Sequence, residues 1–236
     1  MKKLSYIKTL ILGILIASFV SCTGTSSSND TAQGQATNTM NKQNKKEMKY
    51  IKKYTNADFY TDGKFNEEVA VQAYKDMFEF YDIPFTPFLE ENFWVAEFGI
   101  GDFENVGMGG VFWVNDKEHG YFAHAIYLLP GQMIPEHAHV KTEFPAKFES
   151  WMVTRGWCYN FSEVGDATPG APAIPTSHGP IKSKNFVVQN VGDIVHLKKE
   201  ETFHFLMAGP EGAIVDEWAC YHDGTGLRFT NPKAKL

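Results

Sequence analysis

The chain has 236 residues, of which 43% are hydrophobic and 14% aromatic, a composition that supports one sizeable core. We therefore expect a single folded domain. The formal net charge is -6, and no run of lysines or arginines forms a basic stripe outside the N-terminal segment. This charge pattern argues against the usual nucleic-acid-binding classes, so nucleic acid is not an expected partner.

Residues 1–22 have the features of a secretory signal: three early lysines, an apolar run over residues 10–20 and a small residue before Cys22. The apolar run is too short for a typical transmembrane helix. The tetrapeptide Phe-Val-Ser-Cys that ends at Cys22 resembles a lipoprotein cleavage site. We expect export, lipidation of Cys22 and anchoring in the periplasm or at the cell surface through that lipid alone, with an ordinary signal peptide as the alternative.

Residues 23–47 are polar and almost free of apolar side chains, so they cannot bury enough surface to offset the entropy of ordering. They are predicted to be a disordered tether. The folded domain is predicted over residues 48–236. Its first helix is expected after Asn66, a good N-cap followed by Glu67 and Glu68, and to end before Pro84. One apolar face at helical spacing is expected to pack on the rest of the domain: Ala70, Ala73, Tyr74, Met77, Phe78 and Tyr81.

After residue 93 the pattern changes to short aromatic and β-branched runs separated by Gly, Pro and Asn-Asp turns, which predicts an all-β domain. A Pro/Gly-rich loop over residues 162–184 is long enough to be a lid or a pocket rim. The strands are expected at residues 94–98, 110–114, 121–129, 149–156, 186–189, 194–197, 202–208 and 213–221.

Two cysteines lie in the predicted domain, Cys158 and Cys220. An exported protein allows them to pair, and the sequence leaves this open. Both occur in apolar, strand-like runs where cysteine commonly packs as a small buried hydrophobe, so we favour unpaired thiols.

The segment from Gly131 to His139 carries the strongest chemical signal. On an extended chain, His137 and His139 project to the same face and can reach one metal ion. Two imidazoles with a carboxylate suit Mn and non-haem Fe, with Zn, Co and Ni also possible. Glu143 and Glu149 compete for the carboxylate position. We prefer Glu149, which lies in a strand-like run, whereas Glu143 precedes a proline in a predicted turn.

These residues resemble the cupin superfamily. The resemblance implies a double-stranded β-helix barrel with an added N-terminal helix, a single divalent metal with His204 as its fourth ligand, and a possible homodimer. It rests on Gly131, His137-x-His139, Glu149 and Gly156 as a first motif, and on Gly192-Asp193 followed by His204 as a second.

Two further ionisable residues suggest acid–base chemistry next to this site. Lys147 lies two residues before Glu149, so a strand places both on one face. Glu217 interrupts an apolar run, which is unexpected unless it faces a polar cavity. The alternative for Lys147 is a solvated surface lysine, and the alternative for Glu217 is a structural ion pair.

Residues 50–236 resemble cupin sugar isomerases of the D-lyxose ketol-isomerase kind, on His137-x-His139 followed by Lys147-x-Glu149, on His204 and on Phe229-Thr-Asn-Pro232. The resemblance implies a manganese-dependent interconversion of an aldose and a ketose through a cis-enediol. Glu217 would carry the proton and Lys147 would orient the sugar. Further candidates for contact with the substrate are Arg228, His222 and Glu143, and Arg228 has a surface salt bridge as its alternative.

Three functions remain open from the sequence: the sugar isomerase, another metal-dependent cupin enzyme such as a dioxygenase or lyase, and a non-catalytic carbohydrate-binding lipoprotein. The exported location keeps the third in view, because free aldoses are usually isomerised in the cytoplasm. Glu217 separates the first from the third, since only an isomerase should lose turnover and keep its metal in Glu217→Gln.

Overall fold

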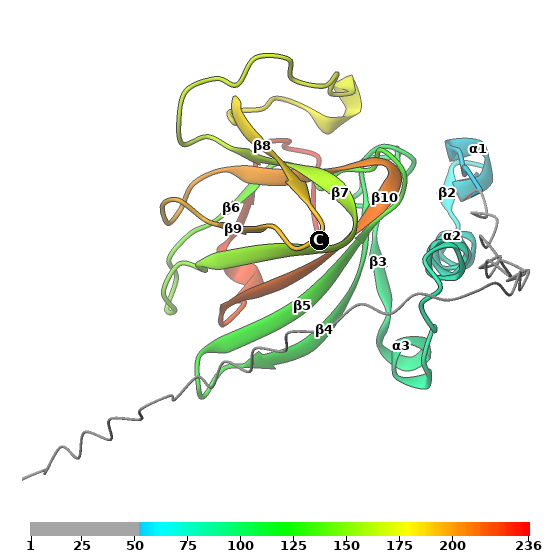
Figure 1. Ribbon diagram of the computed structural model, residues 1–236, viewed down its shortest axis with the longest axis horizontal. Coiled ribbons are helices and arrows are strands. Elements are labelled where there is room, and N and C mark those ends of the chain that lie inside the picture. The colour runs from blue at the N-terminus through cyan, green and yellow to red at the C-terminus, as the bar shows by residue number, and fades with distance from the viewer. Residues whose placement is uncertain (1–51) are drawn as a thin grey trace, which may run out of the picture. The chain divides into compact units, whose positions relative to one another are not determined.

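The computed structural model describes residues 52–236, which form an antiparallel β-sheet curled into a barrel, with helices on one side (Figure 1). The predicted all-β cupin class is thereby confirmed. The predicted signal sequence, Cys22, the tether and the first residues of the predicted domain lie outside the described residues. Among the described residues, no helix is long and apolar enough to cross a membrane.

Within residues 52–236, three α-helices and two single 3-10 turns accompany eleven strands. The helices are α1 (Asn56–Phe59), α2 (Glu67–Phe80) and α3 (Pro87–Asn92). The strands are β1 (Tyr60–Thr61), β2 (Lys64–Phe65), β3 (Trp94–Ala96), β4 (Met108–Asp116), β5 (Tyr121–Leu128), β6 (His137–His139), β7 (Glu149–Ser162), β8 (Asn185–Asn190), β9 (Ile194–His196), β10 (His204–Cys220) and β11 (Leu227–Phe229).

Strand β10 is the centre of the sheet. It pairs with β7 along most of its length, with β5 through its second half, and with β6 at the single position where His204 faces His137. The path of neighbours runs β11-β6-β10-β5-β4-β3, while β8 and β9 extend the sheet beyond β7. This arrangement brings the short β6 and the distant β10 side by side, which places their histidines together.

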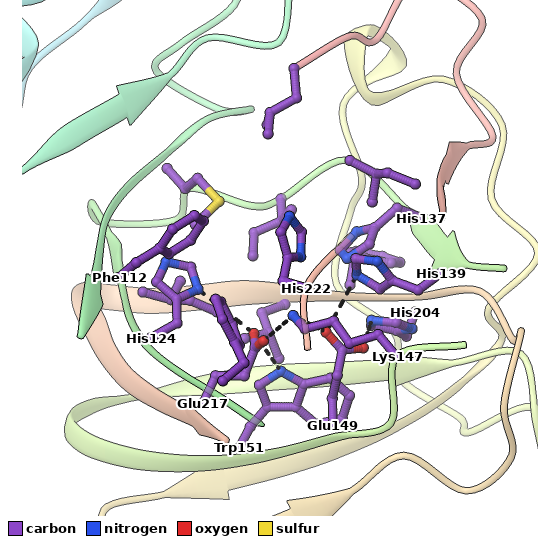
Figure 2. A pocket seen from close by; sticks show the side chains of 18 of the residues that line it. Phe112, His124, His137, His139, Lys147, Glu149, Trp151, His204, Glu217 and His222 are labelled. Carbon is purple, nitrogen blue, oxygen red and sulfur yellow. Dashed lines mark hydrogen bonds and ion pairs between the residues drawn. The ribbon is translucent and has the colours of Figure 1, made fainter. Parts of the chain in front are cut away.

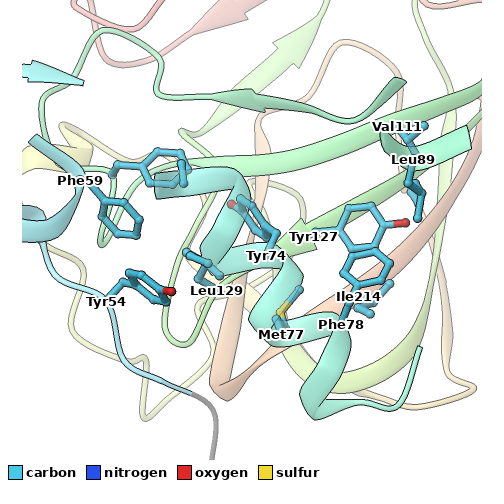
Figure 3. Close-up of a cluster of buried hydrophobic side chains, with 14 residues drawn as sticks. Tyr54, Phe59, Tyr74, Met77, Phe78, Leu89, Val111, Tyr127, Leu129 and Ile214 are labelled. Carbon is cyan, nitrogen blue, oxygen red and sulfur yellow. The ribbon is translucent and has the colours of Figure 1, made fainter. Parts of the chain in front are cut away.

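Strand β5 is buried on both faces, because alternate residues pack in two different layers. Ala125 and Tyr127 face α2 and join the aromatic cluster shown in Figure 3, where Tyr74, Met77 and Phe78 supply the helix side. Ile126 and Leu128 face the barrel interior and pack with Trp151, Val153 and Val215. The helix layer therefore covers the outer face of the barrel and leaves the interior for the site.

The predicted helix is confirmed as α2, with Asn66 as its N-cap accepting a hydrogen bond from the N–H of Val69 (3.3 Å). The helices α1 and α3 were not predicted. Each is too short to show a periodic apolar face, although Thr86, which caps α3, and Pro87 in its first turn are a recognisable start signal.

The strand predictions need two corrections. Strand β7 continues to Ser162 rather than ending at residue 156, because Gly156 bends the strand at φ +65° without ending it. The two strands predicted at 202–208 and 213–221 are one strand, β10, with a register shift between Ala208 and Ala213. The Gly-Pro-Glu-Gly sequence between them reads as a turn, but here it forms a bulge in a continuous strand.

Among the described residues, Cys158 and Cys220 form no disulfide. Cys158 is fully buried in the barrel core, and the Cys220 thiol accepts a hydrogen bond from the N–H of Phe148 (3.1 Å). Burial raises the pKa of the Cys158 thiol to about 12, so it acts as a core side chain.

Candidate active site

A pocket in the barrel interior gathers ionisable and aromatic side chains from β4, β5, β6, β7, β10 and β11 (Figure 2). One end holds three histidines, and the other holds Glu217 and His124 beside Phe112. Lys147 and Glu149 lie between them. Aromatic and aliphatic residues line the remainder, including Trp94, Phe98, Phe122, Trp151, Phe205, Leu227 and Phe229.

The three histidines are His137 and His139 of β6 and His204 of β10. Their nearest nitrogens lie within 4.8 Å of one another, a spacing that one metal ion can bridge. Backbone carbonyls orient two of the rings: His137 Nδ1 lies 2.9 Å from the oxygen of Pro135, and His204 Nδ1 lies 3.0 Å from that of Thr202. These carbonyls hold a proton on Nδ1 of each ring, so the lone pair of Nε2 stays free to bind a metal ion.

Glu149 completes this cluster from β7. Its Oε1 lies 3.4 Å from His139 Nε2 and its Oε2 lies 3.0 Å from His204 Nε2. Glu149 Oε2 and His204 Nε2 are buried and meet only in this ion-pair contact, without a hydrogen bond, and His139 Nδ1 is buried with no hydrogen-bond partner among the described residues. Buried polar atoms without partners are costly, and three imidazoles with one carboxylate are a usual donor set for a divalent metal. The residues present therefore fit a metal ion.

Burial and charge together set the protonation of the cluster. Burial lowers the pKa values of His137 and His139, which favours the neutral imidazoles that bind metals. Burial alone would raise the pKa of Glu149, but Lys147 and His139 outweigh it and hold that pKa well below its usual range. Burial lowers the pKa of His204, yet the adjacent Glu149 raises it overall.

Lys147 joins the two buried carboxylates. Its Nζ donates to Glu149 Oε1 (2.8 Å) and to Glu217 Oε1, and it lies 4.3 Å from the centre of the Phe122 ring. Burial lowers the pKa of Lys147, but Glu149 and Glu217 more than compensate and raise it. The lysine is therefore charged, and the solvated alternative weighed from the sequence does not hold, since only 5% of this side chain is exposed.

Glu217 lies on β10 directly opposite His124 of β5 and Trp151 of β7. Trp151 Nε1 donates to its Oε2 (3.3 Å), and His124 Nδ1 lies 3.9 Å from the same oxygen. Burial raises the pKa of Glu217, but Lys147 outweighs it and holds the pKa at about 2. At neutral pH the group is therefore an ionised carboxylate, the form that can accept a proton.

His222 and His124 also line the pocket. Burial, aided by Lys147, lowers the pKa of His222 to about 3, and its ring stacks on Phe122 at 5.4 Å. His124 was not predicted as a site residue. The sequence did carry a signal that His124 faces the barrel interior. His124 lies two residues before Ile126 on an alternating strand, and this spacing places both side chains on the same face.

Two residues expected near the substrate lie elsewhere. Arg228 alternates with Leu227 and Phe229 on β11, so these two enter the pocket while Arg228 is exposed and donates to the backbone oxygen of Thr225 (2.8 Å). Glu143 is exposed in the predicted turn and does not line the pocket. Glu149, not Glu143, is the carboxylate that meets the histidines.

The loop over residues 162–184 does not form a rim either. No residue of this loop, residues 162–184, lines the pocket. It packs instead behind β6, where the fully buried His178 contacts Phe205 at 4.7 Å between ring centres. Glu136, also fully buried, accepts hydrogen bonds from the backbone N–H groups of Lys182 and Ser183. This carboxylate was missed in the sequence because it lies directly before the more conspicuous His137.

The sequence and the fold are similar to those of known sugar isomerases. The chain is 34% identical to a D-lyxose/D-mannose isomerase of Thermosediminibacter oceani over 161 residues, which cover 65% of this chain and 84% of that protein. It is 30% identical to a D-lyxose ketol-isomerase of Cohnella laeviribosi over 162 residues, covering 68% and 87%. No protein-family model matches the chain.

Among solved structures, the L-ribose isomerase of Cellulomonas parahominis without ligand superposes with a TM-score of 0.53 at 16% identity, over 71% of this chain and 92% of that one. Its complex with L-ribose gives a TM-score of 0.51 at 18% identity, over 70% and 90%. At this identity the solved structures show a shared fold only. The two sequence relatives, at 34% and 30% identity over most of their length, show the family. By its similarity to those relatives, the chain belongs to the D-lyxose ketol-isomerase family of cupin proteins.

Proposed function

We propose that this protein is a metal-dependent aldose–ketose isomerase that acts on a sugar such as D-lyxose or D-mannose. The proposal is supported by the family membership and, above all, by one feature of the site: an ionised Glu217 held by Lys147 beside the histidine cluster. Isomerisation moves one proton between neighbouring carbons next to a carbonyl. A buried carboxylate near a candidate metal site suits that task.

The metal would be held by His137, His139, His204 and Glu149, with Mn as the expected ion and Zn, Fe, Co or Ni as alternatives. When bound, such an ion polarises substrate oxygens and stabilises the charge that develops on them. In the proposed reaction Glu217 takes the proton from C2 of the aldose and returns it to C1 through a cis-enediol, while a second proton passes from the oxygen on C2 to the oxygen on C1. Lys147 keeps Glu217 ionised and donates a hydrogen bond.

The rest of the pocket would bind the sugar and exclude water. His222 is the nearest further candidate for a hydroxyl, since its buried Nδ1 has no hydrogen-bond partner among the described residues. The Trp94, Phe112 and Phe122 rings form an apolar wall on which a sugar face can pack.

Metal analysis combined with a sugar screen tests this function. The full chain should bind one divalent ion, lose it in His137→Ala, and interconvert D-lyxose with D-xylulose or D-mannose with D-fructose when the apoprotein is supplied with Mn. Metal binding without any interconversion would contradict the isomerase and favour a binding protein. Oxygen consumption in place of isomerisation would identify a dioxygenase.

We also propose, from the sequence of residues 1–22, that the protein is exported and anchored through a lipid on Cys22. This location places the sugar-binding pocket outside the cytoplasm, where sugars released from glycans are available. The homodimer expected from the cupin resemblance stays a prediction, which light scattering on the purified protein checks.

A further inference from the structure

The histidine strand β6 is held from behind by part of the long loop, residues 176–183, here called the support segment. It begins with the 3-10 turn Thr176–His178 and ends at Ser183, which is 1% exposed. None of its residues lines the pocket. Its position behind the metal-binding strand therefore needs an explanation other than contact with the substrate.

Glu136 makes the main connection between this segment and β6. Its carboxylate is fully buried and accepts from the N–H of Lys182 (2.8 Å) and from that of Ser183 (2.7 Å). No lysine or arginine forms an ion pair with it among the described residues, since Lys182 Nζ lies over the Phe203 ring instead. A buried carboxylate balanced by backbone amides alone depends on those amides staying in place.

The backbone of Glu136 is held as well. Its N–H donates to His178 Nε2 (3.2 Å), and its carbonyl accepts from the N–H of Thr230 (3.1 Å). Thr230 follows β11, the strand that pairs with β6 on its other side. The residue directly before His137 is therefore fixed to the support segment through both its side chain and its N–H, and to β11 through its carbonyl.

Asn231, which follows Thr230 after β11, makes a further contact with the support segment. Its Nδ2 donates to the carbonyl oxygens of Ser177 (3.0 Å) and His178 (3.1 Å). The next residue of the segment, Gly179, has φ +86°, and a Cβ added there would lie 2.9 Å from Asn231 Cγ. The segment passes Asn231 closely because Gly179 has no side chain.

We propose that the support segment positions the histidine cluster through Glu136, so that the order of this segment and the affinity for metal are linked. Glu136 is a positioning residue: it touches neither metal nor sugar, and it acts on His137 through the backbone. The inference rests on the metal site of the proposed function. By linkage, metal must stabilise the segment as much as the ordered segment strengthens metal binding.

The first test compares metal affinity in Glu136→Gln and wild type, by calorimetry with Mn on the apo form of the full chain. Loss of an outer residue that orients a ligand typically weakens metal binding about 10- to 100-fold, and we expect a loss in that range. The matched control is Glu97→Gln. The Glu97 carboxylate also accepts a backbone N–H, from Gly99 (2.8 Å), but among the described residues Glu97 does not line the pocket and makes no hydrogen bond to β6 or to the support segment. The control should bind metal as wild type does.

The second test reads the segment directly. Lys182 and Lys184 are exposed trypsin sites on either side of the buried Ser183. Mn should slow cleavage at these two lysines in wild type, and this protection should be weaker in Glu136→Gln. If that variant does not fold, Gly179→Ala disturbs the same segment from the Asn231 side and should give the same two effects.

The outcomes separate the two proposals. A wild type that binds no divalent metal would overturn the metal site and this inference together. A wild type that binds metal, with Glu136→Gln and Gly179→Ala binding equally well, would overturn the inference alone. Cleavage that does not respond to Mn would also overturn it. An equal loss of affinity in Glu97→Gln would show a general effect of stability, which contradicts a specific role for Glu136.

Discussion

Lys147 Nζ lies 2.8 Å from Glu149 Oε1, and both side chains are buried in the barrel. The same ammonium donates to Glu217, so one positive charge separates two carboxylates that would otherwise repel each other. This relationship links the candidate metal ligand Glu149 to the candidate proton carrier Glu217. It also means that the three groups depend on one another for their charge states, and the first prediction follows from it.

Replacing the lysine should destabilise the fold. Lys147→Met leaves two buried carboxylates without their shared cation, and breaking a buried ion pair in this way costs about 3–5 kcal/mol. We expect the free energy of unfolding, measured in urea at pH 7 without metal, to fall by an amount in that range. Lys141→Met, at an exposed lysine on the same connection, should change it little. An equal effect of both variants would contradict the buried charge as the cause.

Replacing Glu217 should stop turnover and spare the metal. Glu217→Gln keeps the shape of the side chain but removes its ability to accept a proton, and loss of a general base typically costs about 10²- to 10⁴-fold in kcat. Glu211→Gln changes an exposed carboxylate of the same strand and should retain full activity. The Mn content of both variants, measured by metal analysis, should match wild type. A Glu217→Gln protein with normal kcat would remove Glu217 from the mechanism.

The stability of the metal-free protein should fall as the pH falls below about 6.5. His222 has its pKa lowered to about 3 in the folded state, so between pH 6.5 and 3 the unfolded chain binds a proton that the folded protein does not. The contribution of His222 to the free energy of unfolding is complete above its unfolded pKa of about 6.5, and it is lost as the pH falls toward 3. Glu217, with its pKa lowered to about 2, loses its contribution over a lower range, from about 4.5 to 2.

Denaturation curves at several pH values check this. His222→Phe should have a shallower decline between pH 6.5 and 4 than wild type, because it removes the titrating ring. Parallel curves for wild type and His222→Phe would show that His222 does not titrate differently on folding.

Two glycines with similar backbone angles should respond very differently to alanine. At Gly120, φ is +72° and a Cβ would meet nothing within 4 Å, so Gly120→Ala should cost only the strain of about 1 kcal/mol. At Gly156, φ is +65° and a Cβ would lie 2.1 Å from the Gly212 oxygen. Gly156→Ala should therefore cost several times more in thermal or chemical unfolding. Equal costs would mean that the β7 bend can move away from β10.

Lipid attachment is tested in the producing cell. Labelled fatty acid should be incorporated into the full chain and not into Cys22→Ser, and the wild type should fractionate with membranes. Labelling that persists in Cys22→Ser would place the modification elsewhere, and no labelling in either would favour an ordinary signal peptide.

Local patterns were sufficient for much of the fold and for the composition of the site. Asn66 with two following glutamates marks the start of α2, and alternation of apolar residues marks β5, because caps and periodicity act over a few neighbouring residues. The spacing of His137 and His139, and of Lys147 and Glu149, places each pair on one face for the same reason. These features predicted the all-β class and which residues are candidates for metal binding.

Other features depend on segments far apart in the chain, and only the tertiary structure decided them. The choice of Glu149 over Glu143 follows from the pairing of β7 with β10, and the loss of Arg228 from the pocket follows from the register of β11 on β6. His124 meets Glu217 because β5 and β10 are paired at those positions. The role of the long loop behind β6, rather than over the pocket, depends on Glu136 and two backbone amides more than 40 residues away. Such contacts are set by how distant strands and loops pack, and that is not encoded in any short window of the sequence.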